Sequence, residues 1–264
     1  FVNDFMKKAL DDYLHKNSAA ADEILKRILQ SEKERKDMAG IKKLANKRAK
    51  KANLHNKKLR DCKVHLNDKD GENLFDSTLF ITEGDSAKSM AVAGLSVVGR
   101  DNYGVFPLRG KLLNTRDTAI KQIANNQEIT NIKKILGLES GKKYKNVKSL
   151  RYGKVMIMTD QDHDGSHIKG LVLNMFHSMW PELLELNYVN CMVTPIIKAN
   201  QGKKIKSFYT LTDYNKWKTK GNHNKWSIKY YKGLGTSTSK EAKEYFKDLK
   251  INQYIVDEKT NQSM

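Results

Sequence analysis

Two short apolar runs, each ending at an acidic turn, constrain the fold of this chain more than any other feature. The first run covers 78–82, within the string STLFIT, and the second covers 154–159, with the sequence KVMIMT. Each has the length of a buried strand, and each leads through a glycine-containing turn into a stretch with helical spacing. Strands that alternate with helices predict a parallel α/β sheet, flanked by helices, over about 77–195.

Helices are expected after each of these strands and between them. The helix after the first strand is expected to be capped by Asp85 or Ser86. A second helix is expected over 119–136, ending at Gly137, and a third over roughly 166–180.

The C-terminal third of the chain has weaker patterns. Short apolar runs predict three more strands, at 193–198, 208–211 and 229–231. Residues 201–229 are lysine-rich and indicate an insertion or a hairpin. The string KGLG at 232–235 predicts a tight turn before a helix, in which Thr238 and Glu241 have capping-box spacing.

The N-terminal part differs in character from the predicted sheet. Apolar residues recur at helical spacing over 1–52, whereas 61–76 has no periodicity and indicates a linker. The segment 41–60 contains nine basic residues and no acidic one, which is typical of a solvated arm or of an arm that contacts phosphates. We therefore expect a helical arm and a basic linker before the sheet. Since the sequence begins at Phe1 in mid-pattern, we expect it to be part of a longer chain.

Charge and cysteine content narrow the class of partner and compartment. The formal net charge of +19 favours polyanionic partners, nucleic acid first and an anionic membrane surface second, although a lysine-rich solvated surface gives the same number. No apolar run approaches the ~18 residues of a membrane span, so no membrane partner is expected. Cys62 and Cys191 are far apart in the sequence, which suits a reducing compartment without disulfides.

The acidic residues after the second apolar run suggest a metal site. Asp160, Asp162 and Asp164 alternate with other residues, and in an extended chain they would point to one face. Three carboxylates so close repel one another, and a divalent cation relieves that repulsion. Oxygen ligands favour Mg²⁺, Mn²⁺ or Ca²⁺.

A second acidic residue ends the first apolar run. Glu83, with Asp85 nearby, occupies the place where that strand meets its glycine turn. Sites in open α/β sheets form at the carboxyl ends of the strands, so Glu83 and the aspartate triplet would face one crevice if the two strands are neighbours. Such a group would hold one or two Mg²⁺ ions, and two ions would suit phosphodiester cleavage.

The aspartate string has two other interpretations. The string DQDHDG begins like an EF-hand calcium loop, but the twelfth position holds Leu171 in place of glutamate, and a strand pattern precedes it where the motif requires a helix. An EF-hand is therefore disfavoured. A solvated acidic turn is the remaining alternative, since aspartates are common in turns.

A basic loop lies between the two acidic motifs. Arg109 and Lys111 flank Gly110, whose missing side chain lets the backbone approach a ligand closely. Such cations bind phosphate, and Asn114 would add a hydrogen bond to a nucleotide. An ordinary loop with surface cations has the same composition.

Three strings carry a resemblance to a known family. LFITEGDSAKSMAVAGLSVVGRDNYGVFPLRGKLLN, RYGKVMIMTDQDHDGSHIKGL and KYYKGLGTSTSKEAKEYF resemble the TOPRIM region of type II DNA topoisomerases, in the form of the eukaryotic branch. The resemblance covers roughly 77–250 and implies a TOPRIM-type fold. It also implies a domain order, which is the end of a transducer domain with its basic arm at 1–60, a linker at 61–76, a TOPRIM domain at 77–195 and its extension at 196–264 before a winged-helix domain.

The resemblance also implies roles for the candidate residues. Glu83, Asp160 and Asp162 would be the Mg²⁺ ligands, with Mn²⁺ or Ca²⁺ able to substitute, and Asp164 would complete the catalytic group. The implied DNA-binding residues are Arg109, Lys111 and Asn114.

The activity implied by the resemblance is that of an ATP-dependent type II topoisomerase. Such an enzyme is a nuclear homodimer that passes one DNA duplex through a transient double-strand break. Its nucleophilic tyrosine and its ATPase domain are not recognisable in this sequence, so the chain alone is expected to be inactive. Two other hypotheses are a primase or nuclease with a TOPRIM domain, and a non-enzymatic basic DNA-binding module. In the last case, Asp160→Ala would leave function intact.

Overall fold

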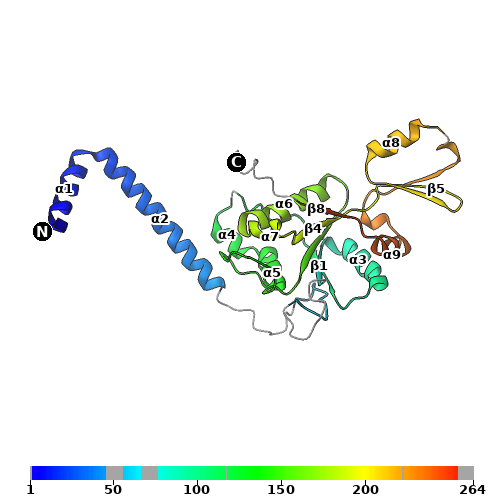
Figure 1. The fold of residues 1–264 in the computed structure, drawn as a ribbon, viewed down its shortest axis with the longest axis horizontal. Coiled ribbons are helices and arrows are strands. Elements are labelled where there is room, and N and C mark those ends of the chain that lie inside the picture. The colour runs from blue at the N-terminus through cyan, green and yellow to red at the C-terminus, as the bar shows by residue number, and fades with distance from the viewer. Residues whose placement is uncertain (1, 46–55, 67–76, 117, 222, 255–264) are drawn as a thin grey trace.

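The computed structural model describes residues 2–45, 56–66, 77–116, 118–221 and 223–254, whose arrangement is drawn in Figure 1. A helical arm leads to a central five-stranded sheet covered by helices, and a three-stranded sheet lies beside it. Across these ranges, no helix combines the length and the apolar character needed to cross a membrane.

Two helices, α1 (Val2–Lys16) and α2 (Ser18–Ala45), form the arm, which extends away from the sheet (Figure 1). The predicted helix over 1–52 is therefore confirmed in type but broken at Asn17, whose carbonyl accepts the first backbone hydrogen bonds of α2. Residues 46–52 of that prediction, and 46–55 of the basic block, lie outside the described residues. Large apolar side chains of the arm are 45–71% exposed, namely Phe5, Met6, Leu10, Tyr13, Ile24, Leu25, Ile28 and Leu29.

The central sheet has the predicted parallel arrangement. Its order is β2-β1-β3-β4-β8, in which the first four strands are parallel and the last is antiparallel. The strands are β1 (Thr78–Glu83), β2 (Tyr103–Leu108), β3 (Lys154–Met158), β4 (Val189–Met192) and β8 (Ile251–Gln253). The two predicted apolar strands are β1 and β3, and they are direct neighbours.

Helices cover both faces of the central sheet, which explains why its strands are apolar without alternation. Leu79 and Ile81 of β1 pack on the face covered by α5 (Gln127–Leu136) and α6 (His163–Met179). Phe80, between them, packs on the opposite face with α3 (Gly84–Val98) and α9 (Ser239–Lys247). The short helix α7 (Pro181–Glu185) belongs to the first of these layers.

Several helix boundaries differ from the sequence prediction. The helix expected over 119–136 is two helices, α4 (Ile120–Asn125) and α5, because the side chain of Asn126 caps α5 by accepting from the Ile129 amide. The end at Gly137 is confirmed, in the left-handed conformation. The expected cap at Asp85 or Ser86 is wrong, because α3 already begins at Gly84 and has no side-chain cap.

The second sheet is antiparallel, with the order β6-β5-β7. Its strands are β5 (Ile197–Gln201), β6 (Lys204–Phe208) and β7 (Ser227–Tyr230), and α8 (Leu211–Thr219) packs on one face through aromatic side chains. The strand predicted at 193–198 is wrong in its bounds, since 193–196 form the loop after β4 and only 197 and 198 lie in β5. The strand predicted at 208–211 is also wrong in its bounds, because Thr210 caps α8 there.

Candidate functional site

The two acidic motifs meet at the carboxyl ends of β1 and β3. Glu83 is the last residue of β1, and Asp160 follows β3 by two residues. The register pairs Thr82 with Met158, which brings the two strand ends level. The side-chain Oε2 of Glu83 accepts the Asp160 amide N–H at 3.2 Å. The two strands are therefore neighbours, as the expected site required, and we call Glu83, Asp160, Asp162 and Asp164 the acidic centre.

A third segment, far away in the sequence, holds the side chain of Asp160. Its Oδ1 accepts the backbone N–H of Leu234 at 2.6 Å. A Cβ added to Gly233 would lie 2.3 Å from Oδ2 of Asp160, so a larger residue there would displace this carboxylate. The KGLG string was predicted as a tight turn and forms the short 3₁₀ helix η3 (Leu234–Thr236). Sequence reasoning missed that this turn positions an acidic side chain.

Asp162 is still extended but Asp164 is helical, so the predicted alternation is wrong beyond Asp162. Asp162 is the N-cap of α6, and its Oδ1 accepts the Gly165 amide at 2.8 Å. Helix α6 therefore begins at His163, earlier than predicted. Asp164 lies in the first helical turn and forms an ion pair with Lys111 at 3.0 Å.

The pKa of the Glu83 carboxyl is shifted by burial and by neighbouring negative charges. Partial burial, followed by the charges of Asp160, Asp162 and Asp164, raises the pKa of the Glu83 carboxyl above its ordinary value. Among the described residues, these carboxylates do not form a group whose oxygens all lie within 4.8 Å of one another. The carboxylate of Asp160 accepts a hydrogen bond from the Leu234 amide, and that of Asp162 accepts one from the Gly165 amide. The two carboxylates are therefore positioned by different parts of the backbone.

The basic loop lies beside the acidic centre, at the carboxyl end of β2. Leu108 is paired with Glu83 across the sheet, and Arg109 follows it directly. Arg109, Lys111 and Asn114 are exposed, and Gly110 has a φ of 71°, in the left-handed region that favours glycine. The structure therefore brings the candidate cations and carboxylates to one edge of the sheet.

The raised pKa of Glu83 leads to a stability prediction. We expect Glu83→Gln to raise the melting temperature of the metal-free chain by a few degrees at most at neutral pH. The folded state binds the Glu83 proton more tightly than the unfolded state, so its stabilising contribution is complete below the unfolded-state pKa and is lost as pH rises through the raised pKa. Glutamine keeps the acceptor for the Asp160 amide but carries no charge.

Thermal melts in EDTA at several pH values would measure this effect. The difference between the variant and the unchanged chain should shrink as pH falls below the ordinary glutamate value of 4.5. Glu185→Gln, at an exposed position of α7, is the matched control and should leave the melting temperature unchanged. A lower melting temperature for Glu83→Gln at neutral pH would contradict the argument.

Comparisons with known proteins identify the domains of this chain. Residues 78–196 match the Toprim domain family, and residues 192–264 match the C-terminal associated domain of TOPRIM. DNA topoisomerase 2 of Pisum sativum is 59% identical over 197 residues, which are 73% of this chain and 14% of that protein. Human DNA topoisomerase 2-alpha is 58% identical over 188 residues, which are 70% of this chain and 12% of that protein.

A solved structure shares the fold as well as the sequence. The crystal structure of the Plasmodium falciparum topoisomerase II DNA-binding, cleavage and re-ligation domain is 51% identical, with a TM-score of 0.68. The match covers 74% of this chain and 26% of that one. Fold and motifs thus define a Toprim domain followed by its C-terminal associated domain. The chain belongs to the eukaryotic type II DNA topoisomerase family, and it spans 12–14% of the length of these two curated relatives.

Proposed function

We propose that this chain supplies the metal-binding part of the DNA cleavage and religation centre of an ATP-dependent type II topoisomerase. The observation that carries the proposal is the meeting of Glu83 and Asp160 at adjacent strand ends, joined by a hydrogen bond of 3.2 Å. The longer protein would pass one DNA duplex through a transient break in another. It would act as a homodimer in the nucleus.

The donor set of the acidic centre fits a hard divalent cation. Glu83, Asp160 and Asp162 offer only oxygen atoms, which suit Mg²⁺, with Mn²⁺ or Ca²⁺ as substitutes. Burial first, and then the charges of the three aspartates, raise the pKa of the Glu83 carboxyl, and a bound cation would relieve the repulsion between these carboxylates. Such a cation stabilises negative charge on the phosphate and on the leaving oxygen during phosphodiester cleavage.

The residues of this chain orient the acidic centre and bind DNA. Leu234 fixes the Asp160 carboxylate through its amide, and Gly165 does the same for Asp162. Arg109, Lys111 and Asn114 extend the site toward a DNA backbone by offering phosphate contacts. In this structure Lys111 forms an ion pair with Asp164. A DNA phosphate would compete with Asp164 for the ammonium group of Lys111.

The nucleophilic tyrosine and the ATP-binding site belong, in this proposal, to other parts of the longer protein. The purified 264-residue chain is accordingly expected neither to relax supercoiled DNA nor to hydrolyse ATP. Relaxation by this chain alone would contradict that division of roles.

Crystals soaked in Mn²⁺ would test the proposal by anomalous scattering. A peak within coordination distance of Glu83, Asp160 and Asp162 is the expected result. If the carboxylates are close but no peak appears, the soak is repeated with a short DNA duplex, whose phosphate oxygens would complete the coordination shell. Absence of a peak in the DNA complex as well would overturn the metal-centre proposal.

A separate prediction concerns the role of Lys111 in binding DNA. We expect Lys111→Ala to reduce the salt dependence of duplex DNA binding by about one unit of slope, because one phosphate contact is lost. The Lys111–Asp164 pair is exposed, so its loss should change the stability of the chain little. Fluorescence anisotropy at several salt concentrations measures the slope.

Lys63→Ala is the matched control for this experiment. Lys63 also forms an exposed ion pair, with Asp101 at 2.8 Å. Asp101 precedes β2, so this pair lies at the opposite edge of the sheet from Lys111. An equal change of slope in both variants would argue against a specific phosphate contact at Lys111.

A further inference from the structure

Residues 56–66, which precede the central sheet, are attached to it by several contacts. Arg60 forms a two-way backbone bridge with Val105 of β2, with N···O distances of 2.9 and 2.8 Å. The Leu66 amide donates to the carbonyl of Arg151 at 2.8 Å, and the side chains of Cys62 and Leu66 are buried. This part of the predicted linker is therefore packed against the domain.

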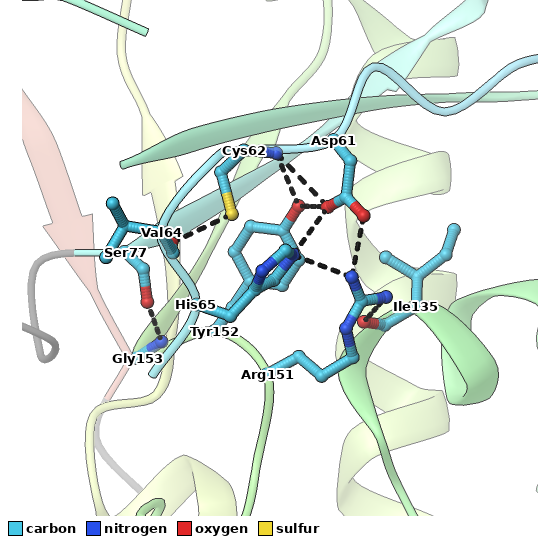
Figure 2. Close-up of polar contacts among 9 residues, drawn as sticks. All are labelled: Asp61, Cys62, Val64, His65, Ser77, Ile135, Arg151, Tyr152 and Gly153. Atoms are coloured by element: carbon cyan, nitrogen blue, oxygen red, sulfur yellow. Dashed lines mark hydrogen bonds and ion pairs between the residues drawn. The ribbon is translucent and has the colours of Figure 1, made fainter. Parts of the chain in front are cut away.

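Three potential metal ligands of different chemistry converge in this segment (Figure 2). Asp61, Cys62 and His65 each offer one donor atom, and these atoms all lie within 4.8 Å of one another. Of the residues that the structure describes, they form the one group with this geometry. A carboxylate, a thiol and an imidazole together suit a borderline-soft ion of the Zn²⁺ class and are a poor set for Mg²⁺.

The two polar contacts of the His65 Nε2 atom cannot both be hydrogen bonds. Its Nε2 lies 3.0 Å from Oδ1 of Asp61 and 2.6 Å from Nη2 of Arg151 (Figure 2). A protonated Nε2 can donate to Asp61, but it then opposes an N–H of Arg151. An unprotonated Nε2 accepts from Arg151, but its lone pair then lies close to the carboxylate. A metal ion bound to Nε2 and to the carboxylate removes this conflict.

The surroundings already provide second-sphere support of the kind that metal ligands require. The Tyr152 hydroxyl donates to Oδ1 of Asp61, and Arg151 donates to Oδ2 at 2.6 Å. Cys62 is only 5% exposed, whereas the side chains of His65 and Asp61 are 16% and 31% exposed, which leaves a path for an ion from solvent.

We propose that Asp61, Cys62 and His65 form a binding site for a Zn²⁺-class divalent ion. The thiolate and the carboxylate would neutralise the charge of the ion, and a solvent molecule would complete a tetrahedral shell. The ion would stabilise the packing of residues 61–65 against the rest of the domain. Tyr152 and Arg151 precede β3 and the acidic centre follows it, so the two sites lie at opposite ends of that strand. The proposal is therefore independent of the proposed cleavage function.

The competing state is a metal-free cluster, in which hydrogen bonds and ion pairs alone connect Asp61, Cys62, His65 and Arg151. Hydrogen bonds with Asp61 and Cys62 raise the pKa of His65 to about 9, despite partial burial. In that state the protonated imidazole and Arg151 would together balance the Asp61 carboxylate. Metal binding must displace the imidazole and thiol protons and shift the guanidinium, and the cobalt experiment below separates the two states.

Co²⁺ titration of the EDTA-treated chain near pH 8 tests the proposal. We expect a thiolate-to-cobalt charge-transfer band in the near ultraviolet and strong visible bands of a tetrahedral ion, both reversed by one equivalent of Zn²⁺. An ion at the all-oxygen acidic centre gives neither signal. A titration without the charge-transfer band would overturn the proposal and favour the metal-free cluster.

Substitutions assign the signal to residues. Cys62→Ser should abolish the charge-transfer band, and His65→Gln should weaken Co²⁺ affinity at least about 100-fold. Cys191→Ser, which removes the other buried cysteine, is the matched control and should keep the full signal. Circular dichroism of each variant verifies folding. A band that survives Cys62→Ser in a folded chain would contradict the assignment.

Discussion

Glu83→Gln, made in the longer enzyme to which we propose this chain belongs, is expected to slow DNA cleavage by roughly 100- to 1,000-fold. The substitution keeps an oxygen that accepts the Asp160 amide N–H, so the strand ends stay level. It removes the negative charge that a divalent cation needs at this position. Negative charge that develops on the phosphate and the leaving oxygen would then be poorly stabilised. The rate of the cleavage step itself would therefore fall.

The amount of linear DNA formed from supercoiled plasmid, measured over a range of Mg²⁺ concentrations, reports this effect. DNA affinity and ATPase activity should stay close to those of the unchanged protein, since neither depends on the Glu83 charge in this proposal. Asp213→Asn is the matched control, because it removes an exposed carboxylate in the first turn of α8 and should not alter cleavage. Cleavage at the normal rate by Glu83→Gln would overturn the proposed role of the Glu83 charge in the metal centre.

The sequence was sufficient to predict the strands that carry the acidic centre. Both β1 and β3 are continuous apolar runs with local turn signals, and both are confirmed. Strand β2 was missed because it contains Gly104 and Pro107, which are rare in strands. Its position at the end of the strand order tolerates proline, and the Tyr152 hydroxyl occupies the place of a Cβ at Gly104.

Long-range contacts explain most of what the sequence did not reveal about the candidate sites. The amide of Leu234 reaches Asp160 across 74 residues, and nothing in the local pattern of either segment predicts that pairing. The same is true of Asp61 and Arg151, which are 90 residues apart. Periodicity reports which face of an element is buried, whereas these contacts depend on how separate elements pack.

The misplacement of Asp164 has a local cause. Alternation of the three aspartates suggested an extended chain, but Asp162 is also a good N-cap residue, and its side chain starts α6. At such positions an aspartate can either cap a helix or continue an extended chain. Here helix α6 is favoured because its apolar face packs on the sheet. Ile168 and Phe176 of α6 are buried there.

Gly165→Ala is expected to destabilise the chain by about 3 kcal/mol, near the upper end for overpacking. A Cβ at this position would lie 2.0 Å from the carbonyl oxygen and 2.8 Å from the carbonyl carbon of Asp160. These are backbone atoms, so no side-chain rotation relieves the overlap. The turn that carries Asp160 and Asp162 must move away from α6 instead, which also disturbs the acidic centre.

Gly170→Ala, in the same helix, is the matched control with the opposite expected sign. A Cβ there meets no atom within 4 Å, and the position is exposed. Alanine should stabilise the helix by about 0.5–1 kcal/mol, because it loses less backbone freedom on folding than glycine. For a domain of this size, about 1 kcal/mol shifts the melting temperature by roughly 2–4 °C. Thermal melts should therefore show Gly165→Ala lower by about 6–12 °C and Gly170→Ala slightly higher. If both variants melted above the unchanged chain, the tight packing of α6 against the Asp160 backbone would be refuted.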